Sequence, residues 1–560
     1  MRIQEEPSQH VRSTRCRTSN MSPFHSPDEI FEPAHPRRIR SVARFALTSG
    51  AFAPFSMQTK TTQILLFLLS AAAACAQYTP PSPATPVPGA IDDFVKAEDP
   101  TLKGWDFGVN ERLRLEEKSS MGTTHAGSNY DLFTNPPTTN SNDYWLSRLM
   151  PRVGYTGDLI AFVVEARSSY SIGDDRYTST AAGKNLAEND GPLQLELGYI
   201  TIGNLKEFPV TLKVGRQYLQ YGEGRLVGNA FWLNIPHTFD AAKVRFQNSY
   251  FGVDVFASNL VYVRNGGHFD QSNSQDTLSG AYFDVPGWSK DNITELYVFA
   301  RDVSRGILTD NWTLVPAPFR FTAPQDTYTF GYRSKSKPAA YGPWDYSLEL
   351  MWQVGNRTAV FPATALAAAK AAPRLDQNAW AFVAQGGYTW KDLPCKPRAA
   401  VIISAASGDQ NSGDQDSQTF MNILPSNHGL YGIMDLSSLQ NIVDYRLSLT
   451  AKPSTTTSVA VDLHQQYLEN NHDFWYNVAG VPRNTPGAAV GSGKGFGINP
   501  GYKSDIGQEA DLIWGWTATK GLLLEVGVGH FFRGDYVKES LRVVGSKDGN
   551  YGYLQATINL

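Results

Sequence analysis

The stretch Trp105–Glu116 reads WDFGVNERLRLE and alternates between two kinds of side chain. One phase carries the apolar residues Trp105, Phe107, Val109, Leu113 and Leu115. The other phase carries Asp106, Asn110, Arg112, Arg114 and Glu116. Because successive side chains of a β-strand point to opposite faces, this stretch predicts a strand with one face for an apolar medium and one for water.

The same alternation recurs to the last residue of the chain. It is found in residues 160–167, 193–199, 242–247, 510–516, 522–528 and 553–560. We count roughly 16 to 18 such segments of about ten residues, the length that spans a bilayer when the strand is tilted. The sequence therefore predicts an all-β chain, a transmembrane antiparallel β-barrel of about 18 strands, with about 16 as the alternative.

A water-soluble β-sandwich would also alternate, because its sheets have one buried and one solvated face. Three features favour the barrel: the segments are long, many carry an aromatic residue at one end, and the chain finishes inside a strand. A closed barrel has no unpaired edge, as hydrocarbon requires. The composition, with 12% aromatic and 18% charged residues and a net charge of -4, agrees with a barrel and does not favour nucleic-acid binding.

Residues 57–76 are predicted to be a signal peptide. Lys60 precedes the short apolar run Ile64–Leu69, and Ala74-Cys75-Ala76 fits the small-x-small cleavage rule before Gln77. The alternative is a lipoprotein acylated at Cys75. Residues 1–56 are interpreted as a start codon assigned too early, with Met57 as the true start, or as a disordered extension.

Residues 77–100 are predicted to form a Pro-rich linker, and residues 101–560 the barrel. Short connections such as 155–158 and 519–521 indicate tight turns, which belong at the periplasmic end. Long polar connections are predicted at about 121–142, 173–191, 265–292, 359–377, 408–440 and 470–504. In a barrel these connections face outward or fold into the lumen.

Two stretches carry a family resemblance. The first is Val214–Gly228, VGRQYLQYGEGRLVG, which continues through Trp232 to Arg245. The second begins at Ser407-Gly408-Asp409 and continues through Phe420, Pro425, His428 and Tyr431. A weaker match is FVVEARS at 162–168. These stretches resemble the alginate export family over roughly residues 105–560, which implies an outer-membrane barrel of about 18 strands whose lumen charges select an anionic polymer.

An anionic polymer needs guanidinium or ammonium groups in a wet pore, since Arg pairs with carboxylates bidentately and keeps its charge. The alternation is consistent with a lumen position for Arg112, Arg114, Arg148, Arg152, Arg167, Lys213, Arg245 and Arg446. Acidic neighbours that could pair with these cations are Glu165, Glu196, Asp240 and Glu349. The alternative is that the charges form a structural ladder that braces a wide barrel.

Arg216 and Arg225 are further candidates for the pore lining. The alternation of Val210, Leu212 and Val214 puts Arg216 on the lipid-facing phase, where an Arg at mid-depth costs about 2–4 kcal/mol. We therefore expect a bulge or a strand end there, which the neighbouring glycines allow. The segment 221–228 is predicted to constrict the pore with Arg225 inside it; the alternative is an ordinary loop tip.

The function expected from these observations is passive passage of an alginate-like anionic polysaccharide or related anionic solutes through the outer membrane of a Gram-negative cell. The alternatives are a general or sugar-selective porin and a non-conducting structural barrel. We expect no enzyme activity and no cofactor, because residues 407–410 and 491–495 lack the setting of a nucleophile elbow or a phosphate loop. The expected partners are outer-membrane lipid and the barrel assembly machinery, with the protein as a monomer.

Overall fold

The computed structural model describes residues 89–121, 131–134, 140–174, 190–205, 208–263, 269–285, 289–303, 307–308, 321–322, 325–358, 373–485 and 487–560. Every described residue lies in one compact unit, Phe67–Leu560. The predicted extension at 1–56, the signal peptide at 57–76 and residues 77–88 of the predicted linker lie outside the described residues.

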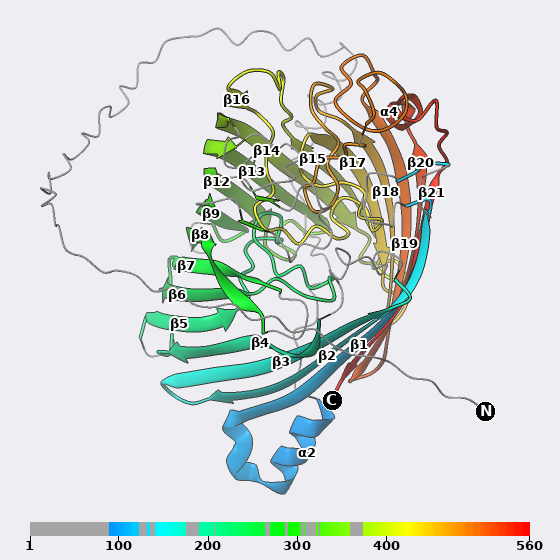
Figure 1. Cartoon of the computed structure of the whole chain (residues 1–560). Coiled ribbons are helices and arrows are strands. Elements are labelled where there is room, and N and C mark those ends of the chain that lie inside the picture. Colours follow the sequence, from blue (N-terminus) through cyan, green and yellow to red (C-terminus); the bar gives the residue numbers. More distant parts are fainter. Residues whose placement is uncertain are drawn as a thin grey trace, which may run out of the picture. The chain divides into compact units, whose positions relative to one another are not determined.

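In the described part of the chain, eighteen strands form a closed antiparallel barrel (Figure 1). They are β1 (Trp105–Ser119), β2 (Ser141–Thr156), β3 (Ile160–Ile172), β4 (Asp190–Ile202), β5 (Val210–Gln217), β6 (Phe239–Gln247), β7 (Gly252–Tyr262), β8 (Gln271–Asp284), β9 (Asn292–Val303), β12 (Gln325–Ser336), β13 (Trp344–Thr358), β14 (Arg374–Thr389), β15 (Arg398–Ala406), β17 (Ile442–Ala451), β18 (Thr457–Tyr467), β19 (Asp505–Thr519), β20 (Leu522–Arg533) and β21 (Gly549–Asn559). Each pairs with its neighbours in the chain, and β1 pairs with both β2 and β21. The prediction of about 18 strands is confirmed.

The described residues also include short elements outside the eighteen wall strands. The strand β16 (Asp416–Ser417) runs parallel to β14, and β10 (Ile307–Leu308) pairs with β11 (Phe321–Thr322). The helix α4 (Asp535–Ser540) lies between β20 and β21 in the chain. In the part of the chain that the structure describes, no helix has the length and apolar character needed to cross a membrane.

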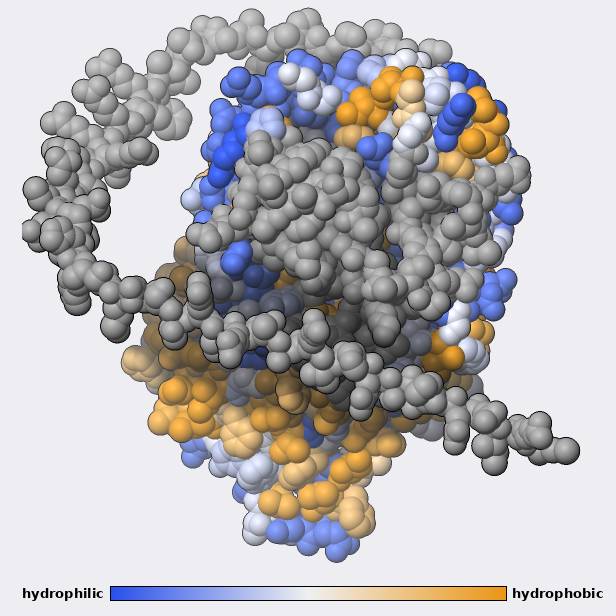
Figure 2. Space-filling model, viewed as in Figure 1, coloured by the Kyte–Doolittle hydropathy of each residue, from blue (hydrophilic) through white to orange (hydrophobic). Residues whose placement is uncertain are grey.

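The two faces of the wall follow the predicted phases. On β1, Leu113 is 41% exposed, whereas its neighbours Arg112 and Arg114 are 4% and 1% exposed. Apolar side chains therefore point outward and polar ones inward, the reverse of a water-soluble protein and the arrangement of a membrane barrel. Figure 2 shows hydrophobic residues gathered over the lower part of the visible face and hydrophilic residues over the opposite end.

The connections differ in length at the two ends of the barrel. Those at 157–159 and 520–521 are short, and they lie at the end where β1 begins and β21 finishes. We call this the turn end, and the other end, where residues 218–238, 407–441 and 468–504 emerge, the loop end. In outer-membrane barrels the short turns face the periplasm.

Two predictions about connections are wrong. The long loop predicted at 265–292 contains the fourteen-residue strand β8. The stretch Gln271–Asp276 is polar in both phases, so alternation gives no signal there; pairing with β7 and β9 makes it a strand. The linker predicted over 77–100 includes the helix α2 (Ala90–Glu98), followed by the 3-10 helix η1 (Pro100–Gly104).

The helix α2 is fixed to the turn end of the barrel by its own acidic first turn. Asp92 accepts a hydrogen bond of 3.1 Å from the backbone N–H of Phe107 in β1, and it pairs with Lys96 at 2.7 Å. Acidic side chains in the first turn and Lys96 in the last also suit the helix dipole. These contacts attach α2 to the wall, which a Pro-rich linker would not do.

Candidate functional site: the lumen and two inner loops

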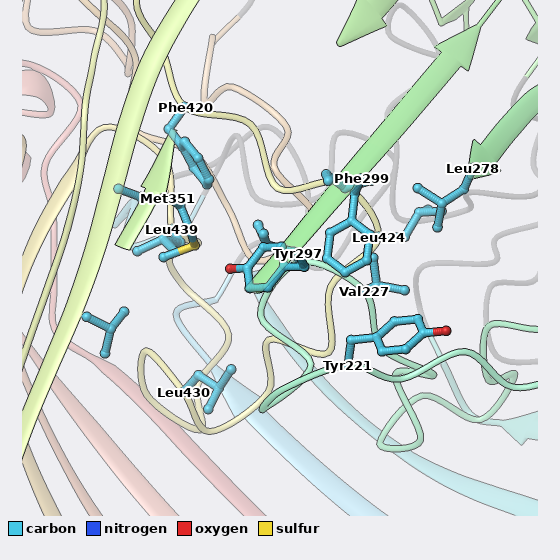
Figure 3. Close-up of a cluster of buried hydrophobic side chains, with 14 of the residues drawn as sticks. Tyr221, Val227, Leu278, Tyr297, Phe299, Met351, Phe420, Leu424, Leu430 and Leu439 are labelled. Atoms are coloured by element: carbon cyan, nitrogen blue, oxygen red, sulfur yellow. The ribbon is translucent and has the colours of Figure 1, made fainter. Parts of the chain in front are cut away.

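Two loops fold into the lumen and pair with each other there. The first inner loop is residues 218–238, between β5 and β6, and the second inner loop is residues 407–441, between β15 and β17. A parallel bridge joins Val227 to Leu424, with hydrogen bonds of 2.9 Å from Gly228 N to Leu424 O and 2.8 Å from Leu424 N to Leu226 O. Figure 3 shows Val227 and Leu424 side by side. The two stretches that carry the family resemblance therefore meet inside the barrel.

An apolar cluster fixes the paired loops against one side of the wall (Figure 3). From the loops it includes Leu219, Tyr221, Leu226, Val227, Phe420, Ile423, Leu424 and Leu430. The Tyr221 ring stacks on Tyr282 of β8 and Phe256 of β7, with centroids 4.8 and 5.3 Å apart. Each fully buried large apolar side chain contributes about 1.5–3 kcal/mol. At this depth the lumen holds a packed core, and passage has to go around or displace it.

Three of the predicted pore-lining arginines bind backbone carbonyls of the first inner loop. Arg112 and Arg148 each donate to Phe231 O at 2.9 Å, and Arg148 also donates to Leu233 O at 3.0 Å. Arg114 donates to Trp232 O at 2.8 Å. All three are at most 4% exposed. All three side chains face the interior of the barrel, where their donors hold a loop in place.

One of these arginines, Arg114, also contacts the point at which the two inner loops stack on each other. The guanidinium of Arg114 lies 3.8 Å from the centre of the Trp232 ring. Trp232 also stacks on His428 of the second inner loop, with centroids 3.6 Å apart and ring planes within 2°. His428 Nδ1 lies 3.0 Å from the carboxylate of Asp435. The row from Arg114 to Asp435 therefore links the wall to both inner loops.

Arg225 lies inside the lumen, as predicted for the segment 221–228, and its charge is compensated. It pairs with Glu223 at 2.7 Å and with Glu349 of β13 at 3.4 Å, and it donates to the hydroxyl of Tyr431. Burial acts to raise the pKa of Glu223, but Arg225 and Arg333 together hold that pKa below its usual range. Arg225 is therefore part of a neutralised buried network.

The predicted residues Arg167 and Arg446 are likewise committed to partners. Arg167 pairs with Glu196 at 2.7 Å and with Asp270 at 2.9 Å. Arg446 pairs with Asp462 at 2.6 Å. Its Nη1 also donates to the backbone carbonyl of residue 429 in the second inner loop. These contacts match the bracing role that the sequence left open as the alternative.

Arg216 and Asp240 pair with each other at the loop end of β5 and β6. They face each other across β5 and β6 with an ion pair of 2.9 Å, in the phase of Val214 and Val244, which are each 41% exposed. Unlike those valines, Arg216 is only 8% exposed, and its guanidinium also donates to the backbone carbonyls of Leu195 and Asp270 at 3.1 and 3.4 Å, so this pair is enclosed at the loop end of the wall. The expected strand end is confirmed: β5 ends at Gln217, one residue beyond Arg216, and Gly215 has a positive φ of 119°.

Four cations gather inside the wall near the turn end, and we call Arg152, Lys213, Lys243 and Arg245 the turn-end cation group. The side chains of Arg152, Lys243 and Arg245 are 19%, 25% and 23% exposed, unlike the buried arginines above. Lys213 lies directly opposite Lys243 across β5 and β6, and its Nζ is 3.5 Å from the centre of the Tyr199 ring. The predicted cations Arg152, Lys213 and Arg245 are therefore brought together.

Carboxylates partly compensate this group. Arg152 pairs with Asp106 at 2.6 Å, Lys243 with Asp254 at 3.0 Å, and Arg245 with Asp284 at 2.7 Å. Among the described residues, none forms an ion pair with Lys213. The predicted acid Glu165 lies opposite Arg152 in the register of β2 and β3 and is fully buried. Within the described part of the chain, the group therefore keeps one ammonium, that of Lys213, without an ion-pair partner.

The sequence reasoning missed Lys243 and Tyr199 in this group. Lys243 has the same phase as Arg245, so alternation alone contained the signal. In the sequence, Tyr199 alternates with the polar residues of β4, which predicts an outward position. A register shift near Glu165 changes which side chains of β4 face inward, and no pattern in the sequence marks that shift. Among the described residues, no three His, Cys, Asp or Glu side chains are arranged to hold a metal ion.

One protein family and several solved structures are similar to this chain. The family model of alginate export matches residues 120–547. The crystal structure of Pseudomonas aeruginosa OccK2 (OpdF) is similar at 12% identity and a TM-score of 0.48, covering 81% of this chain and 97% of that chain. That of Pseudomonas aeruginosa OpdK with vanillate is similar at 12% identity and a TM-score of 0.47, covering 81% and 98%. No curated protein sequence matches. Since the family model spans most of the chain and both inner loops, this chain belongs to the alginate export family.

Proposed function

We propose that this outer-membrane channel passes an alginate-like anionic polysaccharide or related anionic solutes passively, and that the turn-end cation group selects them. The observation that carries the proposal is the direct opposition of Lys213 and Lys243 on the lumen face, with Lys213 in no ion pair with a described residue. Like charges directly opposite each other destabilise a sheet, so an anion between them would be bound favourably.

The partial compensation of the group suits transport. A lumen of one charge sign raises the local concentration of ions of the opposite sign. The carboxylates of Asp106 and Asp254 reduce the net positive charge near Arg152 and Lys243, which favours release of a bound polyanion. Arg112, Arg114 and Arg148 are less suited to this role because their donors bind the first inner loop.

The proposal predicts an anion-selective pore whose selectivity falls in the double variant Lys213→Gln/Lys243→Gln. Each charge removed from a water-filled site changes the interaction with an anion at contact distance by about 1 kcal/mol, which is roughly a fivefold change in the permeability ratio per charge. The measurement is the reversal potential of single channels in a planar bilayer under a salt gradient.

The matched control is Lys520→Gln. Lys520 lies in a turn outside the lumen, and its ammonium pairs with Asp93 at 3.0 Å. This substitution should leave the reversal potential unchanged. Cation selectivity in the unmodified protein, without block by oligouronate, would favour a general or sugar-selective porin and contradict the proposal.

A further inference from the structure

A short segment of the second inner loop, residues 428–437, is seated on the lumen face of three neighbouring wall strands. The contacts come from one side chain of β17, one of β18 and two of β19. They are Arg446 Nη1 to Gly429 O at 3.0 Å, Gln466 Nε2 to Tyr431 O at 2.9 Å, Met434 N to Glu509 Oε1 at 2.9 Å, and Ile433 N to Asp511 Oδ2 at 3.2 Å. Two carboxyl groups of the wall therefore accept backbone N–H groups of the loop.

The fit between this segment and the two carboxyl groups is tight. Gly432 has a positive φ of 100°, and a Cβ at that position would overlap the carboxylate of Glu509. A Cβ at Gly529 of β20 would lie 2.9 Å from Asp511 Oδ1. Glu509 and Asp511 are 1% and 3% exposed. Water therefore does not solvate the pair while the segment is seated.

Two carboxyl oxygens of the pair lack a hydrogen-bond donor, which favours a proton on the pair. Of the four carboxyl oxygens, Oε1 of Glu509 and Oδ2 of Asp511 accept the loop N–H groups. Oε2 of Glu509 and Oδ1 of Asp511 have no hydrogen-bond partner among the described residues, and the two side chains stand two residues apart on the same buried face of β19. Two carboxylates cannot donate to each other, so one proton shared between these oxygens satisfies both.

We propose that the Glu509–Asp511 pair is a proton-dependent latch, which holds residues 428–437 on the wall while it carries one proton and releases them when that proton is lost. The latch concerns regulation, so only its effect on ion flow rests on the proposed function. Loss of the proton leaves two adjacent buried carboxylates, whose repulsion and desolvation disfavour the seated state. Once the segment leaves, water solvates both.

The charged groups around the pair neutralise it only in part: His464, which lies opposite Glu509 in the register of β18 and β19, offsets part of the charge of Asp511. On the wall, Arg446 pairs with Asp462 at 2.6 Å and His464 with Asp444 at 3.0 Å. On the loop, His428 pairs with Asp435, which adds to the negative charge near Glu509, and Tyr551 of β21 lies near Asp435. Each nearby cation already has a carboxylate partner, so the shared proton is what balances the pair.

The sign of the pH dependence follows from the proton count. The seated state binds one proton more than the released state, so release is favoured as pH rises. One proton per release event predicts that protection of the segment falls about tenfold per pH unit, at pH values above the pKa of the carboxyl groups in the released state and below that of the seated pair. The measurement is hydrogen exchange of the 428–437 peptide in the full-length protein, expressed relative to the intrinsic rate at each pH.

Glu509→Gln tests the latch, because the glutamine amide can donate to Asp511 as the shared proton does and cannot titrate. We expect protection in this variant to be independent of pH, and single channels to lose any increase in conductance at high pH. Glu525→Gln is the control. Glu525 lies on the neighbouring strand β20 and accepts a hydrogen bond of 2.8 Å from the Tyr553 hydroxyl, so its substitution should leave the pH dependence intact.

The two readouts separate the latch from the channel. Exchange that depends on pH in the unmodified protein and not in Glu509→Gln supports the latch, even if the protein proves not to select anions. The same pH dependence in both proteins, or none in either, overturns the latch whatever the conductance. If Glu509→Gln does not assemble, Asp511→Asn makes the same test from the other side of the pair.

Discussion

Arg148→Ala is expected to release the first inner loop from the wall, with a larger single-channel conductance and faster proteolysis within residues 229–234. Arg148 donates to the carbonyls of Phe231 and Leu233 at 2.9 and 3.0 Å, and its guanidinium lies 4.1 Å from the centre of the Phe231 ring. Hydrogen bonds from a charged donor contribute about 1.5–3 kcal/mol each, so the seated loop loses roughly 3–6 kcal/mol.

Arg374→Ala is the matched control for this experiment. Arg374 lies at the loop end of β14 and pairs with Asp326 at 2.6 Å, but its side chain is 46% exposed, so its removal costs little. The conductance and the proteolysis pattern should then match those of the unmodified protein. Unchanged conductance and protection in Arg148→Ala would show that the first inner loop does not depend on the arginine contacts.

Gly228→Val is expected to separate the two inner loops. A Cβ at Gly228 would lie 2.8 Å from the Cβ and 3.0 Å from the backbone N of Ser426, and neither atom belongs to a flexible chain end. Overpacking of this kind costs about 1–3 kcal/mol or more. The hydrogen bonds that link Gly228, Leu226 and Leu424 would be lost with it, so we expect raised conductance and faster hydrogen exchange in both inner loops.

The control for this substitution is Gly501→Val, at a glycine with no atom within 4 Å of a Cβ and no positive φ. It should leave conductance and exchange unchanged. If Gly228→Val speeds exchange in the first inner loop alone, the bridge between Val227 and Leu424 does not couple the loops.

The wall could be predicted from the sequence because each strand carries its own signal. The exposed Leu113 beside the buried Arg112 and Arg114 is the pattern that two-residue periodicity predicts when lipid lies on one side. The strand β8 could not be found in this way, because its first residues are polar in both phases and its pairing with β7 and β9 is set by the closure of the barrel.

The sequence predicted which side chains of the candidate site face the lumen, but not which groups they contact there. Alternation placed Arg112 and Arg148 inside, yet their partners are carbonyls of residues 231 and 233, and no local pattern reports a contact over that sequence separation. The same limit explains Arg216: its unfavourable phase correctly predicted a strand end, but its pairing with Asp240 needed the register of β5 and β6.

Arg114 and the turn-end cation group differ in burial and in partners, which is why we propose a bracing role for the first and a binding role for the second. Arg114 and Lys213 both lie on the lumen face, but Arg114 is 1% exposed and bound to a loop, whereas Lys213 faces Lys243 and forms no ion pair with a described residue. Burial and partners, which the sequence does not contain, separate these two roles.

The most direct test of the proposed function is block of the ion current by a short oligouronate added on the periplasmic side of single channels. We predict concentration-dependent block that weakens at high salt and in Lys213→Gln/Lys243→Gln, and no block by a neutral oligosaccharide of equal length. Equal block by the charged and the neutral oligosaccharide, or no block by either in an open channel, would contradict the proposal that these cations select an anionic polymer.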